Sequence, residues 1–166
     1  AYQFNPLENV GVFSNDASLL LPTNSLQGSY RVLGYPQQWS RTMDPDTNGR
    51  DEIRSFMTIV GTAASTRVRI EATADIIPGG PIMQPRGTPI EITLSPFDVL
   101  NLETGAFLAD FTGSLVTADR PVALFSGTEC SDVPFWRTFS DRQAACDHIE
   151  EQNFPLEAAG QAYVLS

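Results

Sequence analysis

The segment that most constrains the fold runs from Thr112 to Cys130 and reads TGSLVTADRPVALFSGTEC. It holds two short β-rich runs, Leu115–Val116 and Val122–Phe125, on either side of an Asp-Arg-Pro turn. Pro121 stands at the start of the second run, where its missing N–H disturbs a strand ladder least. A continuous apolar run is typical of a strand covered on both faces. We therefore expect a hairpin in the core here, with a covalent cross-link through Cys130 just after its second strand.

Length and charge narrow the class of protein. The chain has 166 residues, which suits a single domain with a sizeable core. Its net charge is −10, and all ten basic residues are arginine. An acidic surface repels phosphate, so we expect no nucleic-acid partner and no docking on anionic lipid. No apolar run approaches the roughly eighteen residues of a membrane span, so we expect no membrane insertion. We interpret the start at Ala1, without Met, as processed or excised.

The two cysteines, Cys130 and Cys146, bracket one loop. In an oxidising compartment a bridge between them would contribute about 3 kcal/mol on the chain-entropy view. The alternatives are two free thiols, or half of a metal site completed by His148 and a carboxylate. We favour the disulfide, which predicts an extracytoplasmic setting.

Apolar runs between turn signals predict about nine short strands. The alternation is cleanest in Thr66–Thr73, where Val68 and Ile70 point inward. This run is expected to form a hairpin with Ser55–Gly61 through a short loop. The remaining segments that read as strands or buried runs are Ala1–Phe4, Ala17–Leu21, Tyr30–Tyr35, Ile90–Leu94, Phe97–Leu102 and Gln161–Leu165.

The fold class predicted from this pattern is all-β. Only Arg142–Gln152 offers a helix candidate, of a turn or two. The segments Gln37–Glu52, Ile77–Pro89 and Thr128–Asn153 are expected to be loops because they are polar or rich in proline and glycine. We expect an antiparallel β-sandwich. The alternative is a propeller-like array of small sheets.

The two ends of the sequence resemble one another. Ala1–Pro6 and Ala123–Thr128 each read as a strand that leads into a loop. In both places an aspartate follows, then an apolar residue before a proline, and then a Tyr-containing strand, Gly28–Leu33 or Gly160–Leu165. We interpret residues 1–166 as a single β-domain that is one period of a longer repeat array, with a second unit beginning near residue 123.

Three stretches carry a resemblance to a known family. They are FTGSLVTADRPVALFSGTECSDVP, CDHIEEQNFPLEAAGQAYVLS and SFMTIVGTAASTRVRI. Together with SNDASLLLP and GSYRVLGYP they cover most of the chain, and the cysteine block is the most specific part. The chain resembles the N-terminal domain of the IgGFc-binding protein family, and specifically its bacterial-type members.

This resemblance implies a secreted or surface protein that adheres to mucus, matrix or other proteins and has no established enzymatic activity. It does not imply immunoglobulin binding, because members of the family vary in partner. Three positions depart from the family pattern. Arg120 stands where Lys is usual, Thr128 where His is common, and Ala159 where Trp usually precedes a glycine.

The run DPDTNGRDE matches the start of a calcium-binding loop. Oxygens at alternate positions converge on one cation in such loops, and the glycine allows a sharp turn. The ligands would be Asp44, Asp46 and Asn48 through their side chains, Arg50 through its carbonyl, and Glu52 as a nearby carboxylate. The alternative is a polar turn with no metal. Calcium is the one cofactor that the sequence suggests.

A catalytic site is less well supported. Cys146 and His148 lie two residues apart, and a nucleophile and base this close in sequence rarely meet in a productive geometry. We interpret them as part of a loop that the disulfide closes. Ser126 lies in F-S-G-T rather than in a nucleophile elbow, so it is not expected to act as a nucleophile.

Aromatic residues in loops are candidates for partner contact. Trp39, Phe135 and Trp136 are in such positions, although loop aromatics also pack over sheet edges. The preferred hypothesis is an extracellular or cell-surface, non-enzymatic β-domain that binds proteins or glycans in adhesion. One alternative is a filament or matrix subunit that self-associates through the strand edge of Ala1–Phe4 or Ala162–Ser166. A metal-dependent hydrolase is the remaining alternative.

Overall fold

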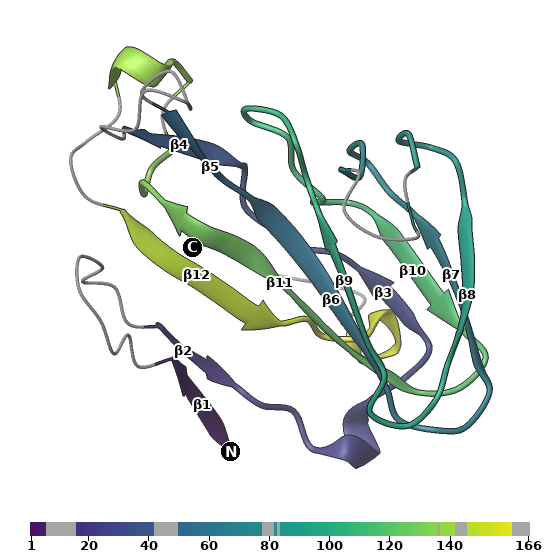
Figure 1. The fold of residues 1–166 in the computed structure, drawn as a ribbon. Coiled ribbons are helices and arrows are strands. Elements are labelled where there is room, and N and C mark those ends of the chain that lie inside the picture. The colour runs from purple at the N-terminus through teal and green to yellow at the C-terminus, as the bar shows by residue number, and fades with distance from the viewer. Residues whose placement is uncertain are drawn as a thin grey trace.

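The structure is a computed structural model that describes residues 1–5, 16–41, 50–77, 82, 84–135, 137–141 and 146–160. Within these residues twelve strands form antiparallel sheets, three more than expected from the sequence. The all-β prediction is confirmed, and two larger sheets face one another as a β-sandwich rather than a propeller-like array (Figure 1). The only helices described are three-residue 3₁₀ turns, and none could cross a membrane.

Each large sheet has four strands, and each of two smaller ribbons has two. The β7 sheet has the order β3 (Ser29–Arg31), β10 (Leu115–Ala118), β7 (Thr66–Glu71) and β8 (Ile90–Leu94). The β6 sheet has the order β12 (Asp147–Gln152), β11 (Val122–Ser131), β6 (Ser55–Gly61) and β9 (Val99–Glu103). The ribbons are β1 (Tyr2–Asn5) with β2 (Asp16–Leu19), and β4 (Gln38–Arg41) with β5 (Arg50–Ile53).

The hydrophobic core fills the space between the two large sheets. In β7 the side chains alternate between buried and exposed, with Val68 and Ile70 inside as predicted. Such alternation places every second side chain on the inner face of a strand. The largest core side chains come from both sheets and from one loop: Tyr30, Met57, Ile59, Ile70, Phe111 and Leu124.

Three tight turns connect one sheet to the other. Residues 62–65 lead from β6 to β7, residues 95–98 from β8 to β9, and residues 119–121 from β10 to β11. The two predicted hairpins are therefore wrong, because the strands on either side of each turn lie in opposite sheets. The sequence marks where the chain reverses. After such a turn the next strand can either bond to the preceding strand or cross to the facing sheet. Which of the two occurs depends on the other strands with which each one pairs.

The three turns stack at the same end of the sandwich (Figure 1). Gly61 N–H donates to Asp98 O at 3.0 Å, and Asp119 N–H donates to Arg67 O at 3.1 Å. Hydrogen bonds from the backbone and guanidinium of Arg67 hold the pKa of Asp119 below its ordinary value. A Cβ on Gly61 would lie 2.3 Å from Ser95 O, so only glycine fits there.

Several local expectations need correction. Asp147–Gln152 forms β12, so the helix candidate over this part is wrong, and so is a continuous loop from Thr128 to Asn153. The polar stretch after Gln37 contains β4 and β5 rather than only loop. The buried run expected at Ala17–Leu21 is mostly exposed or half-buried, because nothing described covers its outer face. The strand expected at Gln161–Leu165 lies outside the described residues.

We expect Tyr30→Phe to destabilise the fold by about 1–3 kcal/mol, because the buried Val122 carbonyl and the partly buried Gln27 N–H lose their partner. The Tyr30 hydroxyl donates to Val122 O at 2.7 Å and accepts from Gln27 N–H at 3.2 Å. Burial raises the pKa of this phenol. Denaturant unfolding measures the loss. Tyr2→Phe is the control, since Tyr2 is 69% exposed, and equal stability of the two variants would contradict the prediction.

Candidate functional site

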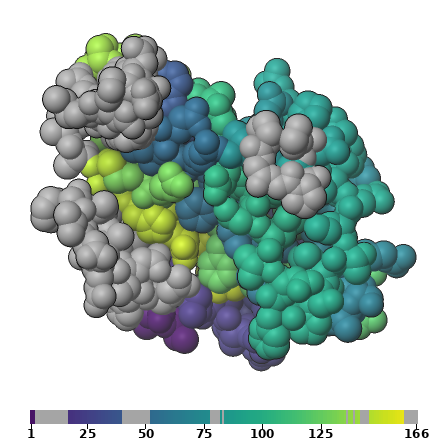
Figure 2. All heavy atoms as spheres, viewed as in Figure 1, coloured from purple at the N-terminus to yellow at the C-terminus, as the bar shows by residue number. Residues whose placement is uncertain are grey.

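The long connections of the sandwich gather at the end opposite the three stacked turns (Figure 1). We call this end the loop end. It is formed by residues 34–37, by the described parts of 72–89, by 104–114, and by the described parts of 132–146. The outer face of the β6 sheet, with β12 in yellow, is visible at the surface beside these loops in Figure 2. Loops held by a rigid scaffold are where binding residues concentrate.

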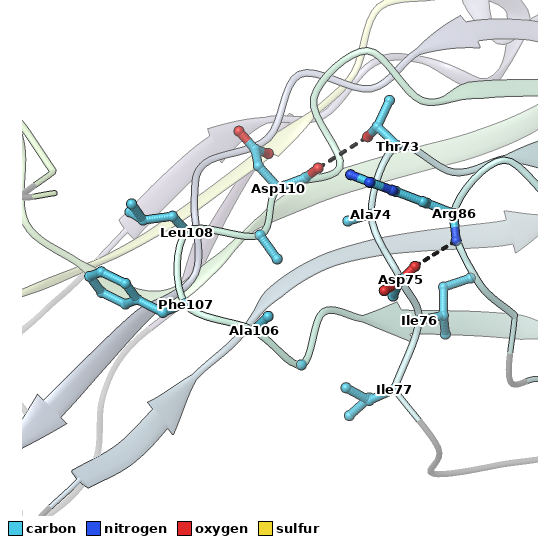
Figure 3. Close-up of a pocket in the computed structure, with 12 residues that line it drawn as sticks. Thr73, Ala74, Asp75, Ile76, Ile77, Arg86, Ala106, Phe107, Leu108 and Asp110 are labelled. Carbon is cyan, nitrogen blue, oxygen red and sulfur yellow. Dashed lines mark hydrogen bonds between the residues drawn. The ribbon is translucent and has the colours of Figure 1, made fainter. Parts of the chain in front are cut away.

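A groove of about 610 Å³ lies between two segments of the loop end (Figure 3). One wall comes from residues 73–77 with Arg86, and the other from residues 105–110. Ile77, Phe107 and Leu108 supply half-buried apolar surface. A volume of this size with a mixed lining is typical of a site for a small molecule or a short segment of a partner.

Hydrogen bonds between polar groups hold the rim of the groove in place. Arg86 N–H donates to the Asp75 carboxylate at 2.7 Å, and the Thr73 hydroxyl donates to Asp110 O at 3.0 Å. The Asp110 carboxylate accepts from the Thr112 N–H at 2.8 Å. Figure 3 shows the exposed Arg86 side chain reaching across towards Thr73 and Asp110. The guanidinium therefore has access to solvent at the mouth, while the Arg86 backbone is tied down.

Gln37 holds the second wall in place. Its N–H donates to Ala109 O at 2.8 Å, and its carbonyl accepts from Leu108 N–H at 2.9 Å. Its buried side-chain oxygen accepts from the Thr104 hydroxyl at 2.7 Å. Leu108 has φ of 63°, a left-handed conformation that costs about 1–3 kcal/mol in a non-glycine residue. The surrounding bonds thus keep this loop in a conformation that it would not adopt alone.

The sequence-predicted contact residue Trp39 lies behind this wall. Its ring packs on Phe107 with centroids 5.0 Å apart, and its side chain is half-buried. Trp39 therefore supports the groove rather than projecting into solvent. Sequence reasoning missed Arg86, Phe107 and Leu108, because they lie in loops with no recognisable motif and only the fold brings the loops together.

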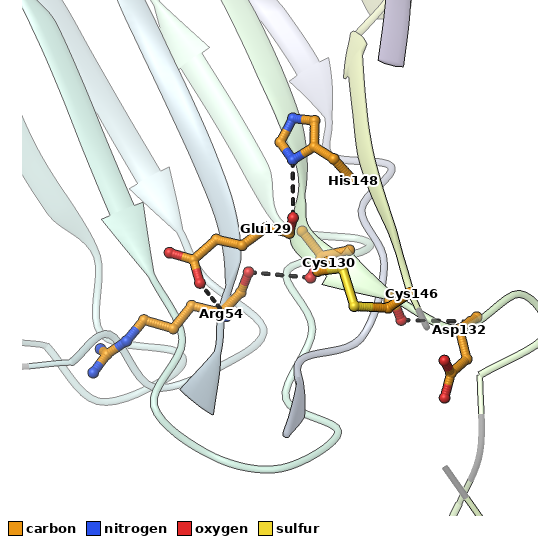
Figure 4. The surroundings of a disulfide bond; sticks show 8 residues. Arg54, Glu129, Cys130, Asp132, Cys146 and His148 are labelled. Carbon is orange, nitrogen blue, oxygen red and sulfur yellow. Dashed lines mark hydrogen bonds between the residues drawn. A yellow bond between two sulfur atoms is a disulfide. The ribbon is translucent and has the colours of Figure 1, made fainter. Parts of the chain in front are cut away.

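The predicted disulfide between Cys130 and Cys146 is confirmed, with an S–S distance of 2.01 Å (Figure 4). Both cysteines are used in it, which overturns the alternatives of free thiols and of a metal site that includes them. It joins the end of β11 to the start of β12. The described residues contain no group of three or more His, Cys, Asp and Glu side chains arranged for a metal.

His148 lies close to the disulfide and is held there by its neighbours. Its Nδ1 lies 3.1 Å from Glu129 O, and its ring stacks on Phe56 with centroids 6.2 Å apart. The Glu129 carboxylate accepts from Arg54 N–H at 3.1 Å (Figure 4). Since the Cys146 sulfur is bonded to another sulfur, it offers no thiolate for the imidazole to activate.

Ser126 also has a structural environment. Its hydroxyl donates to Leu33 O at 2.8 Å and accepts from Asn153 Nδ2 at 2.6 Å. The Asn153 oxygen accepts from Leu33 N–H at 2.8 Å, which closes the triangle. These bonds tie the segment after β3 to β11 and to the segment after β12.

The disulfide loop carries the second predicted contact residue, Phe135. Its ring meets Tyr35 edge-on with centroids 5.7 Å apart, and Arg137 Cζ lies 5.9 Å from the same ring. The Tyr35 hydroxyl donates to Asp132 O and accepts from Phe135 N–H, both at 3.1 Å. Phe135 is thus half-buried but held at the surface. Trp136 lies outside the described residues.

The chain can now be assigned to a class. It is a disulfide-linked β-sandwich domain that holds a set of loops at one end of a rigid scaffold. A family model described as IgGFc binding protein matches residues 16–166, so the chain belongs to the IgGFc-binding protein family.

One curated relative is the human IgGFc-binding protein. It is 29% identical over 150 residues, which cover 90% of this chain. The chain spans only 2% of that relative's own length. No solved structure matches the chain. The assignment to bacterial-type members stays a prediction.

We expect removal of the disulfide by Cys130→Ser with Cys146→Ser to lower the free energy of unfolding by about 3 kcal/mol, because the unfolded chain regains loop entropy. Denaturant unfolding checks this. Reduction of the native protein should give the same loss and serves as the control. A variant as stable as the oxidised protein would refute the prediction.

Calcium binding stays a prediction. Asp44, Asp46 and Asn48 lie outside the described residues, while Arg50 belongs to β5 and Glu52 pairs with Arg54 at 2.8 Å. If the site binds calcium, chelation lowers the melting temperature, because a ligand that binds only the folded state stabilises it. Thermal melting with and without chelator measures this, and Asp44→Asn with Asp46→Asn abolishes the difference. Identical melts would rule the site out.

Proposed function

We propose that this chain is an extracellular, non-enzymatic binding domain that acts in adhesion, and that it recognises a partner protein through its loop end. Membership of the IgGFc-binding protein family supports a binding role. The disulfide supports a setting outside the cytoplasm, where such bonds persist.

The observation that carries the proposal is the groove between residues 73–77 and 105–110. It combines apolar walls with the exposed Arg86 guanidinium, which lies beside the Asp75 and Asp110 carboxylates, on a chain of net charge −10. An arginine beside apolar surface is a typical anchor at protein interfaces. The partner segment that fits this chemistry is an extended peptide with an acidic residue next to an apolar one.

A non-enzymatic role fits what the candidate catalytic residues do. Cys146 is in a disulfide, His148 bonds to a backbone carbonyl, and Ser126 bonds to Leu33 O. Each has a structural function that accounts for its position. Glycan binding is the second candidate, and the half-buried Phe135 beside Arg137 is the observation that favours it, since aromatic rings stack on sugar faces.

The experiment is a binding screen against extracellular proteins and glycans, followed by Arg86→Glu in the purified domain. We expect this charge reversal to weaken binding of the protein partner about tenfold or more, because it places like charges together. The fold should be unaffected, since only the backbone of Arg86 bonds to Asp75. Surface plasmon resonance measures the affinity.

Arg120→Glu is the matched control, because Arg120 is also exposed but lies in a turn at the opposite end. It should bind as the native protein does. Equal loss in the two variants would indicate a general charge effect, and no loss in either would place the binding surface elsewhere. A glycan ligand whose binding is insensitive to Arg86→Glu would favour the second candidate.

A further inference from the structure

Two hairpins of this chain, β1–β2 and β11–β12, have the same register. Tyr2 faces Leu19 as Phe125 faces Gln152, and the next three pairs follow in step in both hairpins. The residue after Leu19 donates its N–H to the residue before Tyr2, at 2.9 Å. The residue after Gln152 donates in the same way to the residue before Phe125, at 2.8 Å. The two ladders are therefore closed by equivalent bonds.

The chain also leaves both hairpins along the same path. Pro22 and Pro155 have backbone angles of −67° and 148°, and of −66° and 150°. A three-residue 3₁₀ turn follows each proline, η1 (Thr23–Ser25) or η4 (Leu156–Ala158). Each turn ends in an extended residue whose N–H bonds back to the first residue of the turn. In the sequence a tyrosine stands eight residues after each proline. This shared path and spacing support the view that the two segments are copies of one element.

Only one of the two hairpins is part of this sandwich. β11 bonds to β6 and supplies Val122 and Leu124 to the core. Among the described strands, β1 and β2 pair only with each other. The core cluster begins at Tyr30 and includes none of the described residues before it. The hairpin β1–β2 therefore lies outside the unit whose core the two large sheets enclose.

The hairpin β1–β2 is nevertheless held against the sandwich. β2 lies beside β12, and the two strands run in the same direction (Figure 1). Leu21 N–H, just after β2, donates to the side-chain oxygen of Gln152 at 2.7 Å. Gln152 is 4% exposed although β12 is an edge strand of the β6 sheet. A small contact that includes polar groups and lies outside the core is typical of a boundary between two units of one chain.

We propose that residues 1–25 are the closing hairpin of a neighbouring copy of this sandwich in the same polypeptide, and that β12 is the surface on which this hairpin sits. One copy then covers residues 26–158. β11 and β12 complete the β6 sheet of this copy, as β1 and β2 complete the equivalent sheet of the copy before it. A division near residue 123 would instead cut through the β6 sheet.

The direction of β2 places the loop ends of the two copies on the same side. β12 starts at the loop end, next to the disulfide, and runs towards the three stacked turns (Figure 1). β2 runs the same way and is the equivalent strand of the neighbouring copy, so the grooves of consecutive copies face the same side. Where the groove binds a partner as proposed above, several copies together strengthen attachment through avidity. The arrangement of the copies does not depend on that binding.

Hydrogen exchange of the full chain tests the contact, with the native protein compared to Gln152→Met and Glu151→Met. Methionine at position 152 keeps the length of the side chain but offers no strong acceptor to Leu21 N–H. Glu151→Met is the control, because it puts the same side chain at an exposed position of the same strand. We expect the Leu21 amide to exchange about tenfold faster in Gln152→Met alone, since one hydrogen bond is lost.

The amide of Ile70 in β7 reports on the sandwich itself. Its exchange should be unchanged in both variants, because the hairpin opens without the core. Equal acceleration at Ile70 and Leu21 would show that hairpin and sandwich unfold as one unit, and unchanged exchange at Leu21 would remove the contact. Either result overturns the proposal. Arg86→Glu should leave exchange at Leu21 as in the native chain, so failure of the binding site and failure of this junction are distinguishable.

The copy itself is tested by sequencing the transcript on the 5′ side of the codon for Ala1. Phe125 in β11 faces Thr58 in β6, which lies 67 residues earlier. Because Tyr2 is the equivalent of Phe125, a strand pattern like that of Ser55–Gly61 should be encoded about 67 residues before Tyr2. A transcript that encodes no such strand, or one that starts at Ala1, overturns the proposal.

Discussion

The burial of apolar side chains between two facing sheets is the interaction on which the rest of the structure depends. Three stacked turns carry the chain from one sheet to the other, so the two strands that each turn joins contribute to opposite halves of the core. Tyr30 shows how closely the halves are joined. Its ring is buried in the core, and its hydroxyl bonds to Val122 in the opposite sheet. Removing water from these faces supplies the main driving force of folding.

Because the turns occupy one end, the long connections gather at the other. There, contacts with the scaffold hold the loops in fixed conformations. Gln37 holds the wall that contains Leu108, Tyr35 holds Phe135, and the disulfide closes the loop between β11 and β12.

Much of the fold could be predicted because strands leave a local signal. Alternation identified β6, β7 and β8, and prolines and glycines identified the turns. Cysteine spacing predicted the disulfide. The residues of the candidate site were much harder to predict from the sequence. Arg86 and Phe107 are separated along the chain and share no motif, and Trp39 supports a wall although its loop position suggested partner contact. Polar sequence also concealed β4 and β12, since strands outside the core need no apolar alternation.

The sequence by itself determined that the chain is all-β, that its inward residues include Val68 and Ile70, and that Cys130 can reach Cys146. These properties depend on side-chain alternation and short loops, which are local. Tertiary structure decided which strands pair. The same tight turn can join neighbours in one sheet or strands in facing sheets, and only the competition for hydrogen-bonding edges selects between them. That selection placed residues 73–77 and 105–110 at one end, and so created the groove between them.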